Sequence, residues 1–563
     1  MKNKIDFSFI REASRNELIK LLSSIPGPKA IVWDKQLVGT FGLIGDFTFL
    51  RNYEVVKMFY ISRENLPSNN IPNIIFLTVP TRNHMDYINN QLRMEEVHSG
   101  GNKKDFYLWC VPRVSLLCEE RLKQHGVYGA FMSIQELPIY MYKLENDVAM
   151  LNLSSCFRDL HMNKDSSDLF FIARALMNIQ GIFGLIPNVY GKGSAAKGVF
   201  DLMVGMRREL GGNEPQLILI DRAVDLITPL ATQLTYEGLI DQFFGINNCT
   251  VKLPSEKFTS MNSRGGSDSP PNDSSSFDFN EMKSIPLTSA DTLFADIRDF
   301  NFSAVGPRLS SEAREVSSQY EKRHTANTVS DLKQFVQKLP KMQVARQSLS
   351  TQTTIAELVQ DKIINSDFRP TLHAEQELLK GSETDKVNSF IEECIYQKEP
   401  LIKVLRLICL QSIINCGLKQ RVFEFYKREI INTYGFEHML TLENLEKAGL
   451  FTVQQGKSTY ATIRKTLRLT VDDVNESKPT DVSYVHSGYA PLSVRLVEFL
   501  QWPGWRAITD VLTVLPGPTI SETQQLPPAL KQRRGPEYVI LTTKIINGNS
   551  FIESLMENLE PLS

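Results

Sequence analysis

The chain has 563 residues, 42% of them hydrophobic and 22% charged, and its formal net charge is -2. A chain of this length makes roughly three or four domain-sized units and can bury a core without disulfides or metals. The balanced charge excludes a long-range field for holding nucleic acid or anionic lipid, and no apolar run approaches the roughly 20 residues that a membrane-spanning helix needs.

The N-terminal part of the chain, 1–131, alternates between strand-like and helix-like runs. Three short apolar runs, at 30–33, 73–79 and 106–111, are typical of strands buried on both faces. Segments 9–22 and 84–94 lie between them and carry apolar residues at helical spacing. This alternation predicts a parallel sheet covered by helices.

A second α/β unit follows. Residues 169–179 are almost wholly apolar, as in a buried helix, and 195–210 place Val199 and Met203 on one helical face. Residues 216–220 are typical of a central strand. Near the end of the chain, 492–500 is helical and 538–542 strand-like, so the α/β character returns.

Residues 255–281 are rich in Ser, Gly, Pro and Asp, which predicts a disordered surface loop. A largely helical stretch follows, and in it one apolar stripe continues in phase through a proline, which predicts a helix that can bend there. A second helix at 355–363 is expected to pack back against the first as a hairpin. The stripe and the start of the second helix comprise Leu332, Phe335, Leu339, Pro340, Met342, Leu349 and Ile355.

The most enzyme-like segment directly follows the strand at 216–220, where α/β enzymes place their ligands. It contains Asp221, Arg222, Asp225, Thr228 and Pro229. Two carboxylates and an arginine could serve acid–base or phosphate chemistry. We favour the alternative, in which the aspartates hold the arginine and backbone amides, and the threonine caps a helix whose first residue is the proline.

No other segment carries a chemical signature. Gly191-Lys192-Gly193-Ser194 fails as a phosphate loop, because Ile186 stands where the first glycine is required and Gly193 where Ser or Thr must follow the lysine. The eight histidines share no metal-ligand spacing with each other or with the seven cysteines, which include no CxxC pair and are expected to be reduced. We therefore predict no catalytic residue, no metal and no cofactor.

Large side chains crowd the segment Tyr434-Gly435-Phe436-Glu437-His438-Met439, which follows an amphipathic helix. Such clusters usually belong to a core, and less often anchor an interface.

The run LILIDRAVDLITPLATQLTYEGLID, residues 217–241, resembles the signature of the SM (Sec/Munc) family, proteins that chaperone SNARE assembly in membrane fusion. LKQFVQKLPKMQ (332–343) resembles the family's helical hairpin, and SGYAPLSVRLV (487–497) resembles a late family segment. The resemblance covers nearly everything except the Ser-rich loop.

The resemblance implies an α/β and α fold, an arch of three domains with doubly wound parallel sheets in the first two. Domain 1 would span 1–131, and domain 2 would join 132–250 to 490–563. The mostly helical domain 3 would span 251–489 and carry the hairpin at 305–365.

KAIVWD (29–34) and NLEKAGL (444–450) are similar to family members that serve in the HOPS and CORVET tethering complexes through a Vps16 subunit. The resemblance implies that the hairpin receives SNARE helices and that the Vps16 contact involves Lys427, Phe436 and Met439. It further implies a cytoplasmic protein peripherally bound to late endosomes and lysosomes, which promotes fusion in lysosomal transport and autophagy.

The sequence departs from the family near its end. A strand and a helix normally precede the segment that matches 537–540, whereas residues 516–536 here are polar and proline-rich. A parallel sheet that lacks a strand is expected to expose unpaired backbone and apolar surface.

Two rival functions remain open at this point. One is a hydrolase or nucleotide-binding enzyme that uses Asp221, Arg222 and Asp225. The other is a purely structural subunit whose only task is docking to Vps16.

Overall fold

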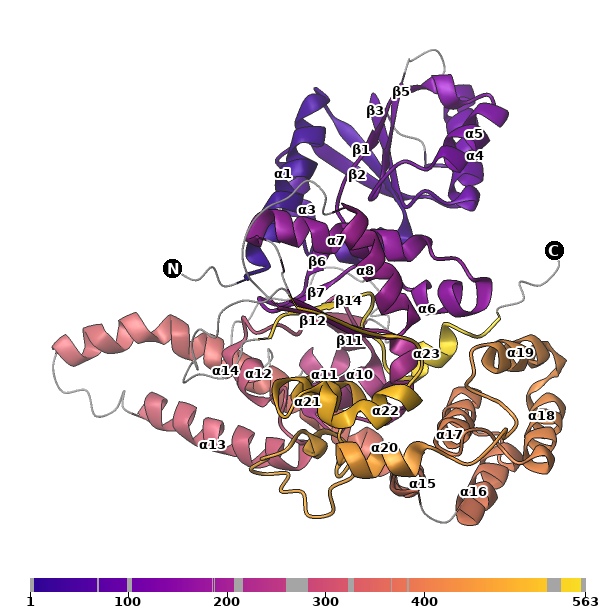
Figure 1. The fold of residues 1–563 in the computed structure, drawn as a ribbon. Helices are drawn as coiled ribbons and strands as arrows, with labels where there is room; N and C mark the ends of the chain where they lie inside the picture. The colour runs from indigo at the N-terminus through magenta and orange to yellow at the C-terminus, as the bar shows by residue number, and fades with distance from the viewer. Residues whose placement is uncertain are drawn as a thin grey trace.

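The structure is a computed structural model that describes residues 5–67, 70–98, 104–184, 186, 188–206, 216–259, 282–321, 329–365, 367–381, 384–523 and 538–557. An α/β unit stands at one end of the molecule, a second α/β layer lies beside it, and helices fill the other end (Figure 1). A long helical arm projects from the middle of the body. In the described part of the chain, no helix is both long enough and apolar enough to span a bilayer.

The first sheet is parallel throughout, with the order β2-β1-β3-β4-β5. Every residue of β1 and β3 is buried, because helices cover both faces of the sheet. The parallel, helix-covered sheet predicted from the alternating runs is therefore confirmed. Its strands are β1(Lys29–Trp33), β2(Val55–Tyr60), β3(Asn73–Thr78), β4(Asp105–Cys110) and β5(Phe131–Glu136). The covering helices are α1(Ser8–Ser24), α2(Lys35–Gly42) and α3(Phe47–Arg51) on one face, and α4(Arg82–His98) and α5(Leu116–Gln124) on the other.

The second α/β layer contains two three-stranded sheets, β13-β8-β9 and β14-β7-β6. The pairs β8–β9 and β7–β14 are parallel, as expected, and the outer strands β13 and β6 are antiparallel. Side chains from both sheets pack on the same cluster around α7(Ser167–Phe183) and α8(Ser194–Met206). The strands are β6(Tyr142–Lys143), β7(Val148–Met150), β8(Asn188–Lys192), β9(Gln216–Ile220), β13(Thr519–Thr523) and β14(Ile540–Thr542).

The sequence predicts that a strand–helix pair of the family is missing before 537–540, and this stays a prediction. The proline-rich region itself contains one strand, β13, which runs antiparallel along β8. Ile520 is buried there against Val189 and Phe200, so a single apolar side chain holds a mostly polar strand to the sheet. Among the described residues, the outer strands β13, β9, β14 and β6 each pair with one strand only.

Segments that are far apart in the sequence meet in this layer. Ile540 of β14 pairs with Val148 of β7, and α23(Gly548–Glu553) packs against α17(Leu401–Ile414) in the largest apolar cluster. Arg158 hydrogen-bonds Glu557. The end of the chain therefore completes a unit that begins near residue 140.

The helices after the arm surround α17, which is buried over most of its length. Its continuous apolar sequence follows from this central position. The neighbours are α15(Phe368–Lys380), α16(Thr384–Tyr396), α18(Gln420–Tyr434), α19(Met439–Lys447) and α20(Tyr460–Leu467).

The arm consists of α13(Phe302–Glu321) and α14(Val329–Asn365), which pack against each other. The expected second helix at 355–363 is wrong as a separate element, because α14 is one helix of 37 residues. No glycine or proline separates Leu349 from Ile355, so nothing in the sequence ends the helix there. The hairpin partner of α14 is α13. Of the predicted Ser-rich loop, Glu256–Thr259 forms the short helix α11, and 260–281 lie outside the described residues.

Candidate protein-interaction site

The apolar stripe of α14 mostly faces inward. Ile355 is fully buried, and Met342 is 7% exposed. Leu349 packs on the cluster that contains Phe294 and Tyr236. Leu349 and Ile355 therefore join the arm to the body, and the buried Met342 and Ile355 are not available to a partner in this conformation. Leu332 and Phe335 also lie on α14, in a part whose side chains are outside the description.

The outward face of α14 carries Pro340, which is exposed inside the helix, and Leu339, which is half-buried. Val344, one turn further on, is 68% exposed. Val344 was not predicted, although its position four residues after Pro340 places it on the same side of a helix. The outer surface of the arm therefore offers an apolar valine beside a proline.

A second exposed apolar surface lies where α18 meets α19. Phe436 is 73% exposed, Met439 42% and Leu440 39%. Gly435, at φ 118°, ends α18 and turns the chain toward them. Leu440 was not predicted. We call Phe436, Met439 and Leu440 the apolar patch.

Lys427 lies on α18, the helix that precedes the patch, and it is not free. Its Nζ is 2.6 Å from Glu446 Oε1 and 5.8 Å from the centroid of the Phe423 ring. The charge is thus fixed on α18 by a half-exposed ion pair, and a partner at this surface would meet a neutralised lysine.

Asp221 occupies the position that an anion would take in a nucleotide-binding fold. It follows β9, and its Oδ2 accepts from the amide of Ala195 at 2.8 Å, at the first turn of α8. Its Oδ1 accepts from the amide of Ala223 at 3.0 Å. A Cβ on Gly193 would collide with the side chain of Asp221, so the glycine is what allows the carboxylate to approach. A carboxylate of the protein itself therefore fills the N-terminus of α8.

Asp225 is 1% exposed and accepts three hydrogen bonds. Two come from the amide and hydroxyl of Thr228, at 3.0 and 2.7 Å, and one from the amide of Ser493 at 2.8 Å. The expected cap is therefore corrected: Thr228 donates to Asp225, which lies two residues before α9(Ile227–Leu230), and Pro229 is the third residue of that helix. The carboxylate accepts from the amide three residues later, much as an N-capping side chain does.

Arg222 interacts with backbone rather than with a carboxylate. Its Nη1 donates to the carbonyl oxygen of Asp225 at 3.1 Å. The expectation that the two aspartates hold this arginine is therefore wrong, because their oxygens are taken by amides and hydroxyls.

The segment after α9 enters a buried polar cluster. Arg406 Nη2 donates to the carbonyl of Leu230 at 2.9 Å and lies 3.3 Å from Glu375 Oε1. Glu375 also accepts from the amide of Thr232 at 2.9 Å. Burial raises the pKa of Glu375 despite the arginine. The cluster joins α15, α17 and the segment after β9, which is an architectural task.

His486 lies at the edge of this cluster and is fully buried. Its Nδ1 is 2.9 Å from the carbonyl oxygen of Thr232, while its Nε2 has no hydrogen-bond partner among the described residues. Burial lowers the pKa of His486 to about 4. The imidazole is therefore neutral at cellular pH.

No metal-binding cluster forms among the described residues. They contain no group of three or more His, Cys, Asp or Glu side chains that could hold a metal ion. Burial raises the pKa of Cys110 and of Cys156 to about 12, so neither is an activated thiol.

Comparison with known proteins finds relatives that match over nearly the whole chain. The family model described as "Sec1 family" matches residues 29–517. Rat vacuolar protein sorting-associated protein 33A is 47% identical over 597 residues, with 98% of each chain covered. The Drosophila melanogaster protein of the same name is 33% identical, with 99% of this chain and 98% of that one covered. The rat alignment is longer than the 563 residues of this chain, so it contains gaps in this chain.

Solved structures share the fold at low sequence identity. The SM protein Vps45 in complex with the Qa SNARE Tlg2 (1-310) gives a TM-score of 0.57 at 15% identity, with 97% of each chain covered. The Unc18–syntaxin 1 complex from Monosiga brevicollis gives 0.55 at 16% identity, with 98% of this chain and 99% of that chain covered.

Proposed function

Because the chain belongs to the Sec1 family, the family of the resemblance, we propose that it is a SNARE-binding chaperone subunit of the HOPS and CORVET tethering complexes. In this role it promotes SNARE assembly and fusion in transport to lysosomes and in autophagosome–lysosome fusion. It acts at the cytoplasmic face of late endosomes and lysosomes as a peripheral protein.

The observation that carries the proposal is the arm. Its inner face is used by its own core, and its outer face presents Pro340 and the exposed Val344. An amphipathic helix binds a groove or ridge through apolar anchors at helical spacing. The proposal is supported by relatives whose structures are described as complexes with a Qa SNARE and with syntaxin 1. Two SNARE helices held along the arm would share one register before they zipper.

The first test charges the outer face of the arm. We expect Val344→Asp to weaken the binding of a SNARE-motif helix at least tenfold, the effect of about 1.4 kcal/mol, because it buries a carboxylate in the contact. The melting temperature should stay the same, since Val344 touches solvent. The matched control is Gln360→Asp, at an exposed position near the far end of α14. Binding is measured by fluorescence anisotropy of a labelled helix.

Two results contradict this part of the proposal. One is equal binding by the two variants. The other is a wild-type protein that binds no R- or Q-type SNARE helix at micromolar concentration.

For the complex itself, we propose that the apolar patch and Lys427 contact the Vps16-like subunit. An exposed phenylalanine flanked by Met439 and Leu440 suits a hot spot that is rimmed by charge. We expect Phe436→Asp to abolish co-purification with that subunit. Trp502→Asp should have no effect, because Trp502 is as exposed, at 74% against 73%, but lies at the end of another helix.

These two variants also separate the rival in which docking is the only task. In that case Phe436→Asp would stop lysosomal delivery in cells, and Val344→Asp would not.

We propose that the protein is not an enzyme. The support is that the carboxylate oxygens of Asp221 and Asp225 accept hydrogen bonds from backbone amides and a hydroxyl. A nucleotide at one hundred times its dissociation constant would add about 2.7 kcal/mol of stability. A thermal-shift screen of nucleotides should therefore show no change, and a reproducible shift with any of them would favour the enzyme.

A further inference from the structure

Residues 291–298, which we call the junction segment, lie where the arm joins the body. Their centre is the short helix α12(Thr292–Ile297). Leu293, Phe294 and Ile297 are buried in the same apolar cluster as residues of both arm helices and of α10(Tyr236–Phe244). The segment therefore packs in the apolar cluster that α10, α13 and α14 share.

Two acidic residues connect the junction segment to the arm, one to each helix. Asp291 accepts from Ser348 Oγ at 2.6 Å and from Gln352 Nε2 at 3.0 Å, both on α14. Asp296 Oδ2 is 2.7 Å from Arg308 Nε on α13. Because each arm helix is fixed to the same short element, the orientation of the arm follows the orientation of α12.

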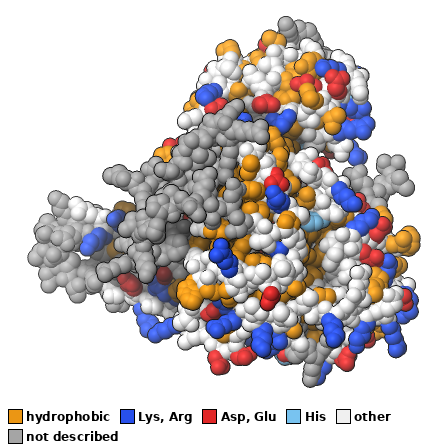
Figure 2. Space-filling model, viewed as in Figure 1, with side chains coloured by type: hydrophobic (Ala, Val, Ile, Leu, Met, Phe, Trp, Pro, Cys, Tyr) orange, Lys and Arg blue, Asp and Glu red, His pale blue; other side chains and the backbone are white. Residues whose placement is uncertain are grey.

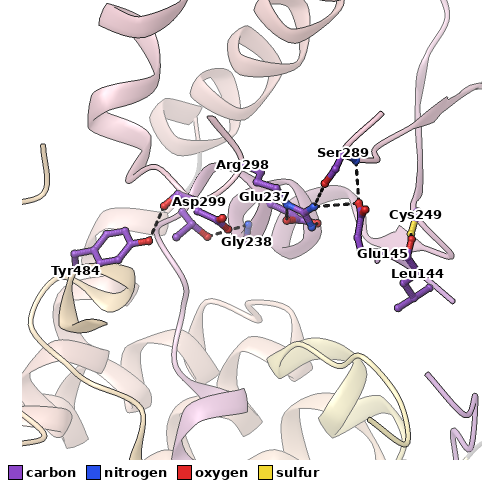
Figure 3. Close-up of polar contacts among 10 residues, drawn as sticks. Leu144, Glu145, Glu237, Gly238, Cys249, Ser289, Arg298, Asp299 and Tyr484 are labelled. Carbon is purple, nitrogen blue, oxygen red and sulfur yellow. Dashed lines mark hydrogen bonds and ion pairs between the residues drawn. The ribbon is translucent and has the colours of Figure 1, made fainter. Parts of the chain in front are cut away.

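One basic residue connects the junction segment to the body. Arg298 makes a bidentate contact with Glu237 of α10, at 2.7 Å from Nε and 2.9 Å from Nη2. Its Nη1 reaches Glu145, in the turn between β6 and β7, at 3.1 Å (Figure 3). Glu145 also accepts from the amide of Ser289 at 2.9 Å. The guanidinium thus bridges the arm root and the second α/β layer.

The ion pairs of Arg298 with Glu237 and Glu145 are partly shielded from solvent. Arg298 is 21% exposed, Glu145 15% and Glu237 28%. Burial raises the pKa of Glu237, although Arg298 acts in the opposite direction. Without the arginine, two neighbouring carboxylates would be left uncompensated, and only a planar fork can satisfy both oxygens of Glu237 at once.

We propose that Arg298 is a positioning residue that sets the direction of the arm relative to the second α/β layer. It touches no partner itself. It acts through α12, whose Asp291 and Asp296 carry the orientation to α14 and α13. The consequence for SNARE binding rests on the function proposed above, while the consequence for the arm does not.

The test is hydrogen–deuterium exchange on the full chain with Arg298→Gln. We expect exchange in 302–321 and 342–359 to rise about tenfold, because α12, to which both helices are bonded, loses its ionic contacts with α10 and with the turn between β6 and β7. Exchange in α15 to α19 should stay unchanged. Arg121→Gln is the matched control: Arg121 makes the same bidentate contact with Asp86 at 2.7 and 3.1 Å, in the first α/β unit. It should leave the arm unaffected.

Arg298→Lys keeps the positive charge but cannot make the bidentate contact, so hydrogen exchange in the arm should rise by an intermediate amount. A uniform rise over the whole molecule, or no rise in the arm, would overturn the proposal, because a residue that only adds stability would loosen α17 as much as α14.

Binding of a SNARE-motif helix supplies the second readout. Arg298→Gln should weaken it about tenfold, and Arg121→Gln should not. If the wild type binds no such helix, the proposed function fails, and the exchange pattern still decides whether Arg298 positions the arm. Wild-type affinity in Arg298→Gln, together with a loosened arm, would show that arm direction does not control binding and would overturn that consequence.

Discussion

Buried polar side chains decide the path of the chain after β9. Asp221 is 5% exposed, Asp225 1% and Glu375 3%, and each accepts hydrogen bonds from backbone amides. Leaving such a group without its partners costs about 1–3 kcal/mol. The enzyme-like segment after β9 is therefore explained by the hydrogen bonds that its aspartates accept from the backbone.

Removal of the Asp225 carboxylate should be strongly destabilising. Asp225→Ala loses three hydrogen bonds and leaves the amides of Thr228 and Ser493 without an acceptor, so we expect the free energy of unfolding to fall by about 3 kcal/mol. Denaturant unfolding measures the change. Asp201→Ala, which removes an exposed carboxylate paired with Lys197, should change the free energy by less than about 0.5 kcal/mol. Equal effects of the two variants would show that Asp225 has no special structural role.

His486 should make the protein lose stability in mild acid. Its pKa is about 4 in the folded protein against 6.5 for an ordinary histidine, so the unfolded chain takes up the proton first. The contribution of His486 to stability is complete above pH 6.5 and falls by about 3 kcal/mol as the pH decreases toward 4. Unfolding curves between pH 7 and 5 check this, with His486→Leu as the comparison. The variant should show a smaller loss over that interval, and an identical loss would assign the effect to other groups.

Within the elements, the arm shows what an apolar stripe can and cannot reveal. The spacing of Leu339, Met342 and Leu349 predicts a helix correctly, because the period of the side chains belongs to the helix itself. It does not say which surface will cover that face: Leu349 and Ile355 pack in the cluster that contains residues of α12 and α13, and Met342 is buried. Val344 escaped notice for the same reason, since it lies off the stripe.

Ile355 distinguishes a core role from a contact role. It is fully buried, so Ile355→Ala should lower the free energy of unfolding by 2–5 kcal/mol, roughly the usual range for such a cavity. Val344→Ala should change it by less than about 0.5 kcal/mol. Thermal unfolding of both variants compares them. If Ile355→Ala melts like the wild type, the inner face of α14 is not part of the core.

At the scale of the whole molecule, balanced charge is visible on the surface. Acidic and basic side chains intermingle over the face shown in Figure 2, in agreement with a net charge of -2. No long-range field therefore guides a partner to this face, and recognition there depends on shape and on local apolar contacts.

The centre of the first sheet was predictable because β1, β3 and β4 are close together in the sequence and each is an apolar run. The strands β2 and β5 were not predicted, since both carry exposed side chains. The pairing in the second layer was not, since β7 and β14 come from distant parts of the sequence and no local pattern encodes their register. Only the family resemblance suggested that the end of the chain returns to it. The placement of β13, with one buried isoleucine in a polar strand, carries too little local signal to predict.

Removal of the end of the chain should unfold the second layer and spare the first. A chain that stops at residue 537 lacks β14 and α23, so β7 loses a partner strand and α17 loses contacts with Phe551, Ile552 and Leu555. We expect hydrogen exchange to stay slow in β1 and β3 and to become fast in β7 and α17. Continued protection of α17 in the shortened chain would contradict the view that the last helix belongs to its core.

The pairing of β7 with β14 also dictates an order of events during synthesis. Val148 leaves the ribosome long before Ile540, its partner, and the interval is roughly 20 to 80 seconds at the usual rate of translation. For that whole interval one edge of the nascent second layer has no strand beside it, while the first sheet is already able to close. The unpaired edge of the second layer is therefore the part of the nascent chain that is exposed to aggregation. We expect it to need a molecular chaperone until the last strand and helix emerge.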